Sequence, residues 1–317
     1  MTFPSDKPIL IIAGPTAVGK TDASILLAQE LDAEIVSADS MQVYRGMDIG
    51  TAKPSPEQRS LVYHHLIDVV DPIQPYSVGD YLRDARAAID GILSGGGTPI
   101  VVGGTGMYIR ALMRGLFHGP PADTELRARL LQREAAEGEG ALYAELSLVD
   151  PAAAVKIHPH DLRRTVRALE VYVLKKVPIS ELQQDHAFGE RPYRFRLLFL
   201  TRERPELYRR IEERVDWMVA EGLEEEVGRL KERGCDNRLT SMQGLGYMHF
   251  LDVLDGNASH TEAVALLKRD TKRYAKRQFT WFRREPDAVW VDVTGLVDGR
   301  EIVRRIKKNV DISGDLV

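Results

Sequence analysis

The chain alternates between short apolar runs and longer stretches in which apolar residues recur at helical spacing. A run such as "PILIIAG" (8–14) is apolar at every position before its glycine, which is typical of a parallel strand covered on both faces. Helical spacing begins near Lys20, and "YLRDARAAIDGILSGG" (81–96) predicts an amphipathic helix that ends at a glycine run. The pattern predicts strands at 8–14, 33–39, 98–106, 194–201 and 287–293.

Strands that alternate with helices predict an α/β fold with a mostly parallel sheet flanked by helices. Between 119 and 192 no strand pattern is found, so we expect a helical domain inserted there. The catalytic core would then comprise residues 1–118 and 193–317, with 203–285 mainly helical.

Composition limits the class of protein. With 317 residues, of which 44% are hydrophobic, the chain can bury a sizeable core. A single cysteine, Cys235, excludes an internal disulfide and is typical of a reducing cytosol. The apolar run before the glycine loop is too short for a signal peptide, and no run reaches the ~20 residues of a membrane span. We expect a cytoplasmic protein that does not contact membranes.

The sequence "GPTAVGKT" (14–21) matches the phosphate-binding loop G-x-x-x-x-G-K-[ST] in full, after a predicted strand and before a predicted helix. Gly14 and Gly19 let successive backbone N–H groups face an anion at the helix N-terminus. Lys20 brings a positive charge to the phosphates, and the Thr21 hydroxyl can bind Mg²⁺. The expected fold is therefore P-loop NTPase-like, but the loop alone does not say which phosphate it holds.

Asp39 follows the second predicted strand, at the edge of an open α/β sheet where ligands bind. Its carboxylate is a candidate metal partner or general base, and the alternative is a cap of a turn or helix. Small-molecule kinases with this loop also place an acid here, so Asp39 does not separate a kinase from a transferase. The third strand ends in "GGTG", without the acid of motor-type ATPases, which disfavours steady ATP hydrolysis.

The segment "KRDTKRYAKRQFTWFRR" (268–284) has eight basic residues and one Asp, a local charge of +7 in a chain whose net charge is −4. On a helix, its lysines and arginines form two adjacent rows, with aromatic residues between them. Such a surface suits a polyanion, because cations bind phosphates and rings stack on unpaired bases. The alternative is a solvated charged face whose aromatics belong to the core. The rows and the rings are Lys268, Lys272 and Lys276; Arg269, Arg273 and Arg277; and Tyr274, Phe279, Trp281 and Phe282.

A second helix, "DLRRTVRALEV" (161–171), has arginines opposite an apolar stripe, although a purely structural helix would look the same. The residues taken alone leave three functions open. One is transfer of a group from a diphosphate to RNA, one is a nucleoside or metabolite kinase, and one is a nucleotide-gated RNA-binding protein without chemistry. A kinase does not account for the basic aromatic strip, and a binding protein leaves Asp39 idle.

Several long segments together resemble the tRNA dimethylallyltransferases, isopentenyltransferases that modify the adenosine 3′ of certain anticodons. They run through most of the chain: "GPTAVGKT", "SADSMQVYRGMDIGTAKP", "HHLID", "VGGTGMYI", "DLRRTVRALEV", "RIEERVDWMVAEGLEEEV", "SMQGLGYM" and "YAKRQFTWFR". The resemblance implies that the loop receives the diphosphate of dimethylallyl diphosphate, which leaves as pyrophosphate when the dimethylallyl group passes to N6 of adenine. It also implies Mg²⁺ as cofactor, a tRNA anticodon stem-loop as partner and action as a monomer.

The resemblance also implies roles for particular residues. Asp39 takes the position of the base that activates N6, while Lys20, Thr21 and an arginine of "LYRRIEERV", Arg210 in preference to Arg214, assist the diphosphate. The implied diphosphate-binding residues are Gly14, Pro15, Thr16, Ala17, Val18, Gly19, Lys20 and Thr21, with Thr21 as the metal ligand. The implied tRNA-contacting residues are Asp39, Ser40, Met41 and Gln42; Thr105 and Arg127; Arg163, Arg164, Thr165, Val166 and Arg167; Gln243, Gly244, Leu245, Gly246, Tyr247 and Met248; and Lys276, Arg277, Gln278, Phe279, Thr280, Trp281, Phe282 and Arg283.

One departure from the resembled pattern lies at Gln243 and Gly244, where some members carry Arg or Lys and then Cys. No cysteine–histidine zinc module follows the catalytic region, and "HPHD" (158–161) is not expected to bind a metal.

Overall fold

A computed structural model describes residues 8–117, 119–186 and 192–309. Its centre is a parallel six-stranded sheet with the order β3-β2-β4-β1-β5-β6. The α/β fold and the five predicted strands are confirmed, and the two-residue β3 is an addition that the pattern did not predict. The strands are β1 (Ile9–Ala13), β2 (Ala33–Ala38), β3 (His64–His65), β4 (Thr98–Gly103), β5 (Phe195–Thr201) and β6 (Val289–Asp292).

The central position of β1 in the sheet explains why its sequence is apolar at every residue. Its five residues are all buried, and it is hydrogen-bonded to β4 on one side and to β5 on the other. Parallel pairing brings the carboxyl ends of the strands to one edge, where Gly103 is in register with both Ala13 and Ala38. The phosphate loop after β1, Asp39 after β2 and the "GGTG" segment after β4 therefore meet at this edge.

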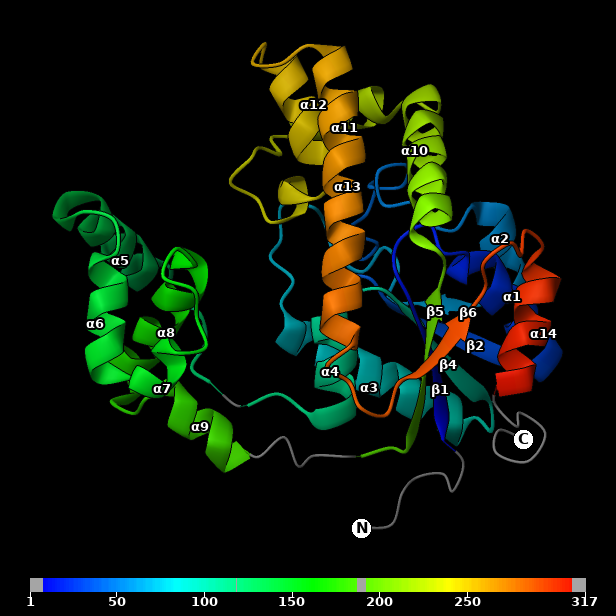
Figure 1. Cartoon of the computed structure of the whole chain (residues 1–317), viewed down its shortest axis with the longest axis horizontal. Coiled ribbons are helices and arrows are strands. Elements are labelled where there is room, and N and C mark those ends of the chain that lie inside the picture. The colour runs from blue at the N-terminus through cyan, green and yellow to red at the C-terminus, as the bar shows by residue number, and fades with distance from the viewer. Residues whose placement is uncertain (1–7, 118, 187–191, 310–317) are drawn as a thin grey trace. The chain divides into compact units, whose positions relative to one another are not determined.

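Helices cover the sheet and extend from it (Figure 1). The longest, α13, begins at a capping box of Ser259 and Glu262 and packs along α10 and α12. The C-terminal helix α14 packs on α1, the helix that follows the phosphate loop. These helices are α1 (Lys20–Leu31), α2 (Pro56–Leu61), α3 (Val78–Ser94), α4 (Gly106–Arg114), α10 (Arg204–Ala220), α11 (Leu223–Glu232), α12 (Tyr247–Leu254), α13 (His260–Phe282) and α14 (Gly299–Asn309), with a 3₁₀ turn at Ser241–Gln243.

The chain divides into two compact units, 1–113 with 191–317, and 114–190. The second unit is helical and has its own core, in which Leu142 and Leu169 are fully buried. Of the predicted domain boundaries, residue 118 lies outside the described residues, as do 187–191 beside the other boundary. The helices of this unit are α5 (Thr124–Glu137), α6 (Ala141–Val149), α7 (Pro151–Ala154), α8 (Leu162–Lys175) and α9 (Ile179–His186). Within the described ranges, none of the helices combines the length and the apolar character that crossing a membrane requires.

Candidate active site

The phosphate loop lies between β1 and α1, as its sequence predicts. Gly19, just before α1, adopts a left-handed backbone with φ of 104°, and a Cβ there would also approach Ile302 Cδ1 at 3.1 Å. A side chain would be strained at this position, which explains the second glycine of the motif. Ala17 also has a positive φ of 63°, so the loop curls tightly, as anion-binding loops do.

Lys20 points back into this loop. Its Nζ donates hydrogen bonds to Gly14 O at 3.0 Å and Pro15 O at 2.8 Å. Burial and the positive charge of Arg214 together lower the pKa of Lys20 to about 7, although the charge of Asp39 acts in the opposite direction. The ammonium group is thus held among positive neighbours, where a bound anion would be strongly stabilising.

Three arginines brace the loop from outside it. Arg210 Nε donates to Ala17 O at 2.9 Å, and Arg214 Nη1 donates to the Thr16 hydroxyl at 3.2 Å. Arg202, which follows β5 and was not predicted, donates from Nε to Val18 O at 2.8 Å. Arg214 is the one whose pKa is influenced by Asp39, and it also acts on Lys20. Of the two arginines that the sequence offered, Arg210 therefore contacts the loop backbone, and Arg214 contacts a loop hydroxyl and acts on Lys20.

The two carboxylate oxygens of Asp39 have different surroundings. Its Oδ1 accepts hydrogen bonds from Met41 N at 2.8 Å and Gln42 N at 3.3 Å, so the turn-capping alternative holds for this oxygen. Within the described residues, Oδ2 accepts no hydrogen bond, and the charge of Asp39 raises the pKa of both Lys20 and Tyr274. Asp39 is consequently fixed in orientation by one oxygen while the other is available beside the phosphate loop.

The "GGTG" segment holds the residue after Asp39. Thr105 Oγ1 accepts from Ser40 N at 3.0 Å and donates to Ser40 Oγ at 3.3 Å, and its backbone N–H bonds to Ala38 O. Burial raises the pKa of Tyr274 of α13, Asp39 raises it further, and the side chain of Thr105 opposes both effects. Thr105 therefore holds the Asp39 turn and also lies near Tyr274 of α13.

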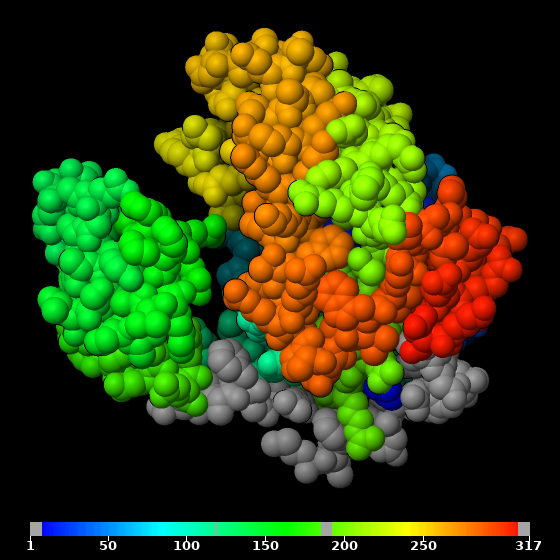
Figure 2. All heavy atoms as spheres, viewed as in Figure 1, coloured from blue at the N-terminus to red at the C-terminus, as the bar shows by residue number. Residues whose placement is uncertain are grey.

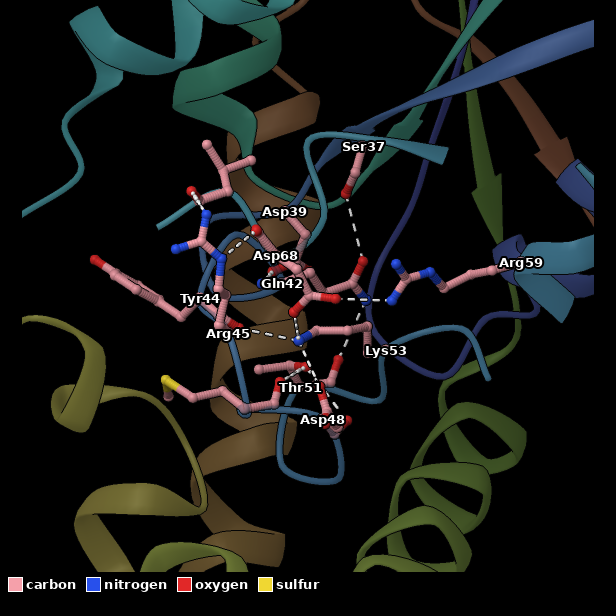
Figure 3. A network of polar contacts seen from close by, with 12 residues as sticks. Ser37, Asp39, Gln42, Tyr44, Arg45, Asp48, Thr51, Lys53, Arg59 and Asp68 are labelled. Carbon is pink, nitrogen blue, oxygen red and sulfur yellow. Dashed lines mark hydrogen bonds and ion pairs between the residues drawn. The ribbon is translucent and has the colours of Figure 1, made fainter. Parts of the chain in front are cut away.

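The segment after Asp39 folds into a loop that is held by hydrogen bonds and ion pairs of Gln42 and Lys53 (Figure 3). Gln42, one of the predicted tRNA-contacting residues, donates hydrogen bonds from its Nε2 to Thr51 O and Ala52 O, both at 3.3 Å. Lys53 has a nearly buried side chain and donates to Tyr44 O at 2.9 Å. It also binds Asp48 Oδ1 at 2.5 Å and Asp68 Oδ1 at 2.7 Å, and Arg59 binds the other oxygen of Asp68 at 2.7 Å.

Glu226 of α11 also binds this loop, through the loop's backbone N–H groups. Its Oε2 accepts from Asp48 N and Ile49 N at 2.9 Å, and its Oε1 accepts from Gly50 N at 3.1 Å and the Tyr247 hydroxyl at 2.7 Å. Glu226 is buried, and so is Tyr247, whose pKa burial and Glu226 raise well above its usual value. The "QGLGYM" segment thus supports the Asp39 loop through Tyr247.

Helix α13 carries the predicted basic strip, and its side chains reach the surface along the core unit (Figure 2). The lysine row partly faces α10, where Lys268 Nζ binds Asp216 Oδ1 at 2.6 Å and Lys272 binds Glu212. The lysine row therefore adds less to the predicted positive surface than its sequence suggests, because these two lysines are paired with carboxylates of α10. Arg273 binds Asp270, and Arg277 lies over the Tyr274 ring at 5.6 Å.

Several predicted RNA contacts belong to the interior. Tyr247 and Phe282 are fully buried and Gln278 is 5% exposed, so their side chains are closed off from RNA in this conformation. Phe279 packs edge-on against Phe199 of β5, which fits the core alternative for this ring. Arg110 stacks on Trp281 at 4.3 Å to the ring centroid. The exposed members of these segments are Gln243, Met248, Lys276, Arg277, Thr280 and Arg283.

In the second unit, the predicted contact Arg127 lies on α5 and Arg167 on α8. Both bind the buried carboxylate of Glu170, Arg127 through Nε and Nη2 at 2.8 and 2.9 Å and Arg167 at 2.5 Å. Arg163 and Arg164 are exposed, whereas Thr165 and Val166 are buried. The cluster of Arg127, Arg167 and Glu170 has a net positive charge. Its two arginines, both predicted to contact RNA, are bound to Glu170 in this structure.

The site fits a metal ion that is bound mainly by phosphate oxygens and water, with few protein ligands. Within the described ranges, no group of three or more His, Cys, Asp or Glu side chains could hold an ion. Mg²⁺ at phosphate sites usually takes one or two protein ligands and fills its shell with phosphate oxygens and water. The half-buried Thr21 hydroxyl, in the first turn of α1, fits that arrangement.

Comparison with known families gives a consistent match. A family model described as IPP transferase matches residues 42–285, and one described as isopentenyl transferase matches residues 7–65. The tRNA dimethylallyltransferase of Syntrophobacter fumaroxidans is 49% identical over 95% of this chain and 87% of its own length.

Solved structures agree with the sequence matches. A tRNA isopentenylpyrophosphate transferase from Bacillus halodurans is 42% identical, covers 98% of this chain and 97% of its own, and superposes with a TM-score of 0.72. A eukaryotic dimethylallyltransferase acting on tRNA is 30% identical, covers 97% of this chain and 80% of its own, and has a TM-score of 0.80.

Proposed function

The chain belongs to the IPP transferase family, and from this premise we propose that it is a tRNA dimethylallyltransferase. It transfers the dimethylallyl group of dimethylallyl diphosphate to N6 of the adenosine 3′ of the anticodon and releases pyrophosphate. The observation that carries the proposal is geometric. The phosphate loop follows β1 and Asp39 follows β2, and Gly103 of β4 is in register with the last residues of both strands, so the loop and the carboxylate lie at one edge of the sheet. The charge of Asp39 acts on Lys20 and Arg214, which supports assigning Arg214, in place of the predicted Arg210, to the diphosphate.

The donor binds through its diphosphate at residues 14–21. Lys20 and Arg214 stabilise the negative charge that grows on the diphosphate as the bond between its oxygen and the allylic C1 breaks. The pyrophosphate keeps the electron pair of that bond, and C1 becomes cation-like. Mg²⁺, held by the Thr21 hydroxyl and the phosphates, would neutralise further charge on this leaving group.

The acceptor amine needs a base, because the N6 lone pair is delocalised into the adenine ring. In the proposed reaction N6 forms the new bond to C1, and its proton passes to Asp39 Oδ2. The adenosine must leave its stack to reach this position, which costs a few kcal/mol and least in a loop. Oδ1 stays bonded to Met41 N, so the carboxylate does not need to reorganise during transfer.

The RNA binds through exposed cations of both units, among them Arg273, Arg277, Arg163 and Arg164. In this proposal residues 1–118 and 193–317 form the P-loop catalytic core, and the helical insertion contributes to RNA binding. The cytoplasmic location and the monomeric state stay predictions.

Replacing Arg273 and Arg277 of α13 by glutamine should weaken tRNA binding and flatten its salt dependence. Each phosphate contact releases condensed counterions, so the slope of log K against log salt should fall by roughly 1.4 to 1.8 for two lost contacts. Filter binding between low and moderate salt measures this slope. The control is Arg300→Gln with Arg304→Gln on α14, which removes the same charge from exposed positions elsewhere. An unchanged slope in the α13 variant would remove α13 from the interface.

Donor binding should take up a proton above pH 7. The pKa of Lys20 is about 7 in the free protein, and a bound diphosphate favours the ammonium form and raises it. At pH 8 the free side chain is mostly neutral, so binding consumes up to about 0.9 of a proton and affinity falls as pH rises. Calorimetry in buffers of different ionisation enthalpy measures the uptake. Lys20→Met should lose it, and equal uptake in both proteins would contradict the assignment.

An assay with an unmodified anticodon stem-loop, Mg²⁺ and either dimethylallyl diphosphate or ATP separates the proposal from its alternatives. Prenylated RNA formed without ATP supports the proposal. A phosphorylated product would indicate a kinase, and binding without turnover would indicate an RNA-binding protein.

A further inference from the structure

Gln278 bridges two loops of the active site from the inner face of α13. Its Oε1 accepts a hydrogen bond from Thr16 N in the phosphate loop at 3.0 Å. Its Nε2 donates to Gly104 O, in the segment after β4, at 2.9 Å. Both ends of this buried amide are therefore satisfied by backbone groups that belong to the catalytic machinery.

The contact with Gly104 depends on the absence of a side chain there. A Cβ on Gly104 would lie 2.3 Å from Gln278 Nε2 and 3.2 Å from Gly14 O. The second glycine of "GGTG" is thus the residue that lets α13 approach the phosphate loop. Because packed interiors deform little, a small displacement of α13 at Gln278 should also displace the Gly104 backbone, and the reverse.

The neighbouring turns of α13 give Gln278 its context. One turn earlier, Tyr274 lies near Thr105, which accepts a hydrogen bond from Ser40 N beside the catalytic carboxylate. Arg277, next to Gln278 in the chain, is exposed. The same stretch of helix therefore presents cations outward, holds the donor loop through Gln278 and lies near the acceptor turn.

We propose that Gln278 is a positioning residue that couples RNA binding on the outer face of α13 to diphosphate binding at the phosphate loop. This inference rests on the proposed function, since it takes α13 as an RNA-binding surface. RNA phosphates that bind Arg273 and Arg277 restrain α13, and Gln278 passes the restraint to the Thr16 amide. A loop that is already ordered loses less entropy when the diphosphate binds, so its affinity rises.

Coupling of this kind is reciprocal, and coupled sites usually change each other's affinity about 5-fold or more. We expect the donor to bind at least about 5-fold more tightly when the stem-loop is present. Gln278→Met keeps the unbranched shape and length of the side chain but loses both hydrogen bonds. Its coupling factor should fall to about 1, while RNA affinity without donor stays within about 2-fold of the wild type.

The experiment measures donor affinity with and without a stem-loop whose target adenosine is replaced by inosine, which has no N6 amine and cannot react. Wild type, Gln278→Met and Gly104→Ala are compared, because the Gly104 variant displaces the amide without altering it. Thr271→Val, buried on the same helix, is the matched control and should keep the wild-type factor. Thermal unfolding of each protein shows that it is folded.

The proposal is overturned if wild type shows no coupling, if both test variants retain it, or if Thr271→Val loses it equally. Where Gln278→Met fails to fold, the Gly104 variant alone decides between these results. Turnover of the reactive stem-loop by the wild type is measured in parallel. Absent prenyl transfer would refute the proposed function, whereas lost or retained coupling bears on Gln278.

Discussion

Asp39→Asn is expected to lower kcat about 10³-fold, within the range usual for a lost general base, while RNA affinity changes by less than about 2-fold. Asparagine keeps an oxygen for the backbone N–H groups of Met41 and Gln42, so the turn should survive. Its amide cannot accept the proton that N6 must release. Single-turnover kinetics with saturating donor, together with equilibrium RNA binding, measure the two quantities separately.

The control for Asp39→Asn is Glu34→Gln, which removes a carboxylate from β2, the strand that precedes Asp39, where Glu34 binds His65 at 2.7 Å. That variant should turn over at the wild-type rate. Equal losses of kcat and RNA affinity in Asp39→Asn would mean that the carboxylate acts by holding RNA or the loop, and not as the base.

Glu226→Gln is expected to lower the free energy of unfolding by about 3 kcal/mol, because a buried charged acceptor is lost. The Glu226 carboxylate accepts from three backbone N–H groups of the 48–50 loop and from Tyr247. The glutamine side chain has the same size, but its NH₂ group would replace one of the accepting oxygens and face the N–H groups that now bind it. The Asp39 loop should loosen, so the RNA concentration at half-maximal rate should rise as well. Urea denaturation measures the first effect, and initial rates against RNA concentration measure the second.

The exposed neighbour Glu225 provides the matched control, and Glu225→Gln should alter stability by less than about 0.5 kcal/mol. If Glu226→Gln were as stable as Glu225→Gln, the hydrogen bonds to the 48–50 loop would not support the site.

The sheet and the phosphate loop could be predicted from the sequence because their signals are local. Residues 9–13 are apolar at every position, and the glycines at 14 and 19 flank the loop within one short motif. The strand β3 could not be predicted, because its two residues are strand only through pairing with Ile35 and Val36 of β2.

The supporting parts of the site escaped prediction because their partners are far apart in the chain. Gln278 lies 262 residues from Thr16, and Glu226 lies 178 residues from Asp48. A helical pattern shows that Gln278 lies in a basic stretch, but not that its side chain turns inward. The same limit applies to Lys268 and Lys272, whose neutralising carboxylates come from α10.

The most direct measurement mixes the purified protein with Mg²⁺, dimethylallyl diphosphate and an anticodon stem-loop, and follows RNA mass and released pyrophosphate together. The account predicts one five-carbon group on the adenosine 3′ of the anticodon for each pyrophosphate released, without ATP, and no transfer when that adenosine is replaced by inosine. Unaltered RNA, or the same mass gain on the inosine-containing RNA, would contradict alkylation of N6 at this site.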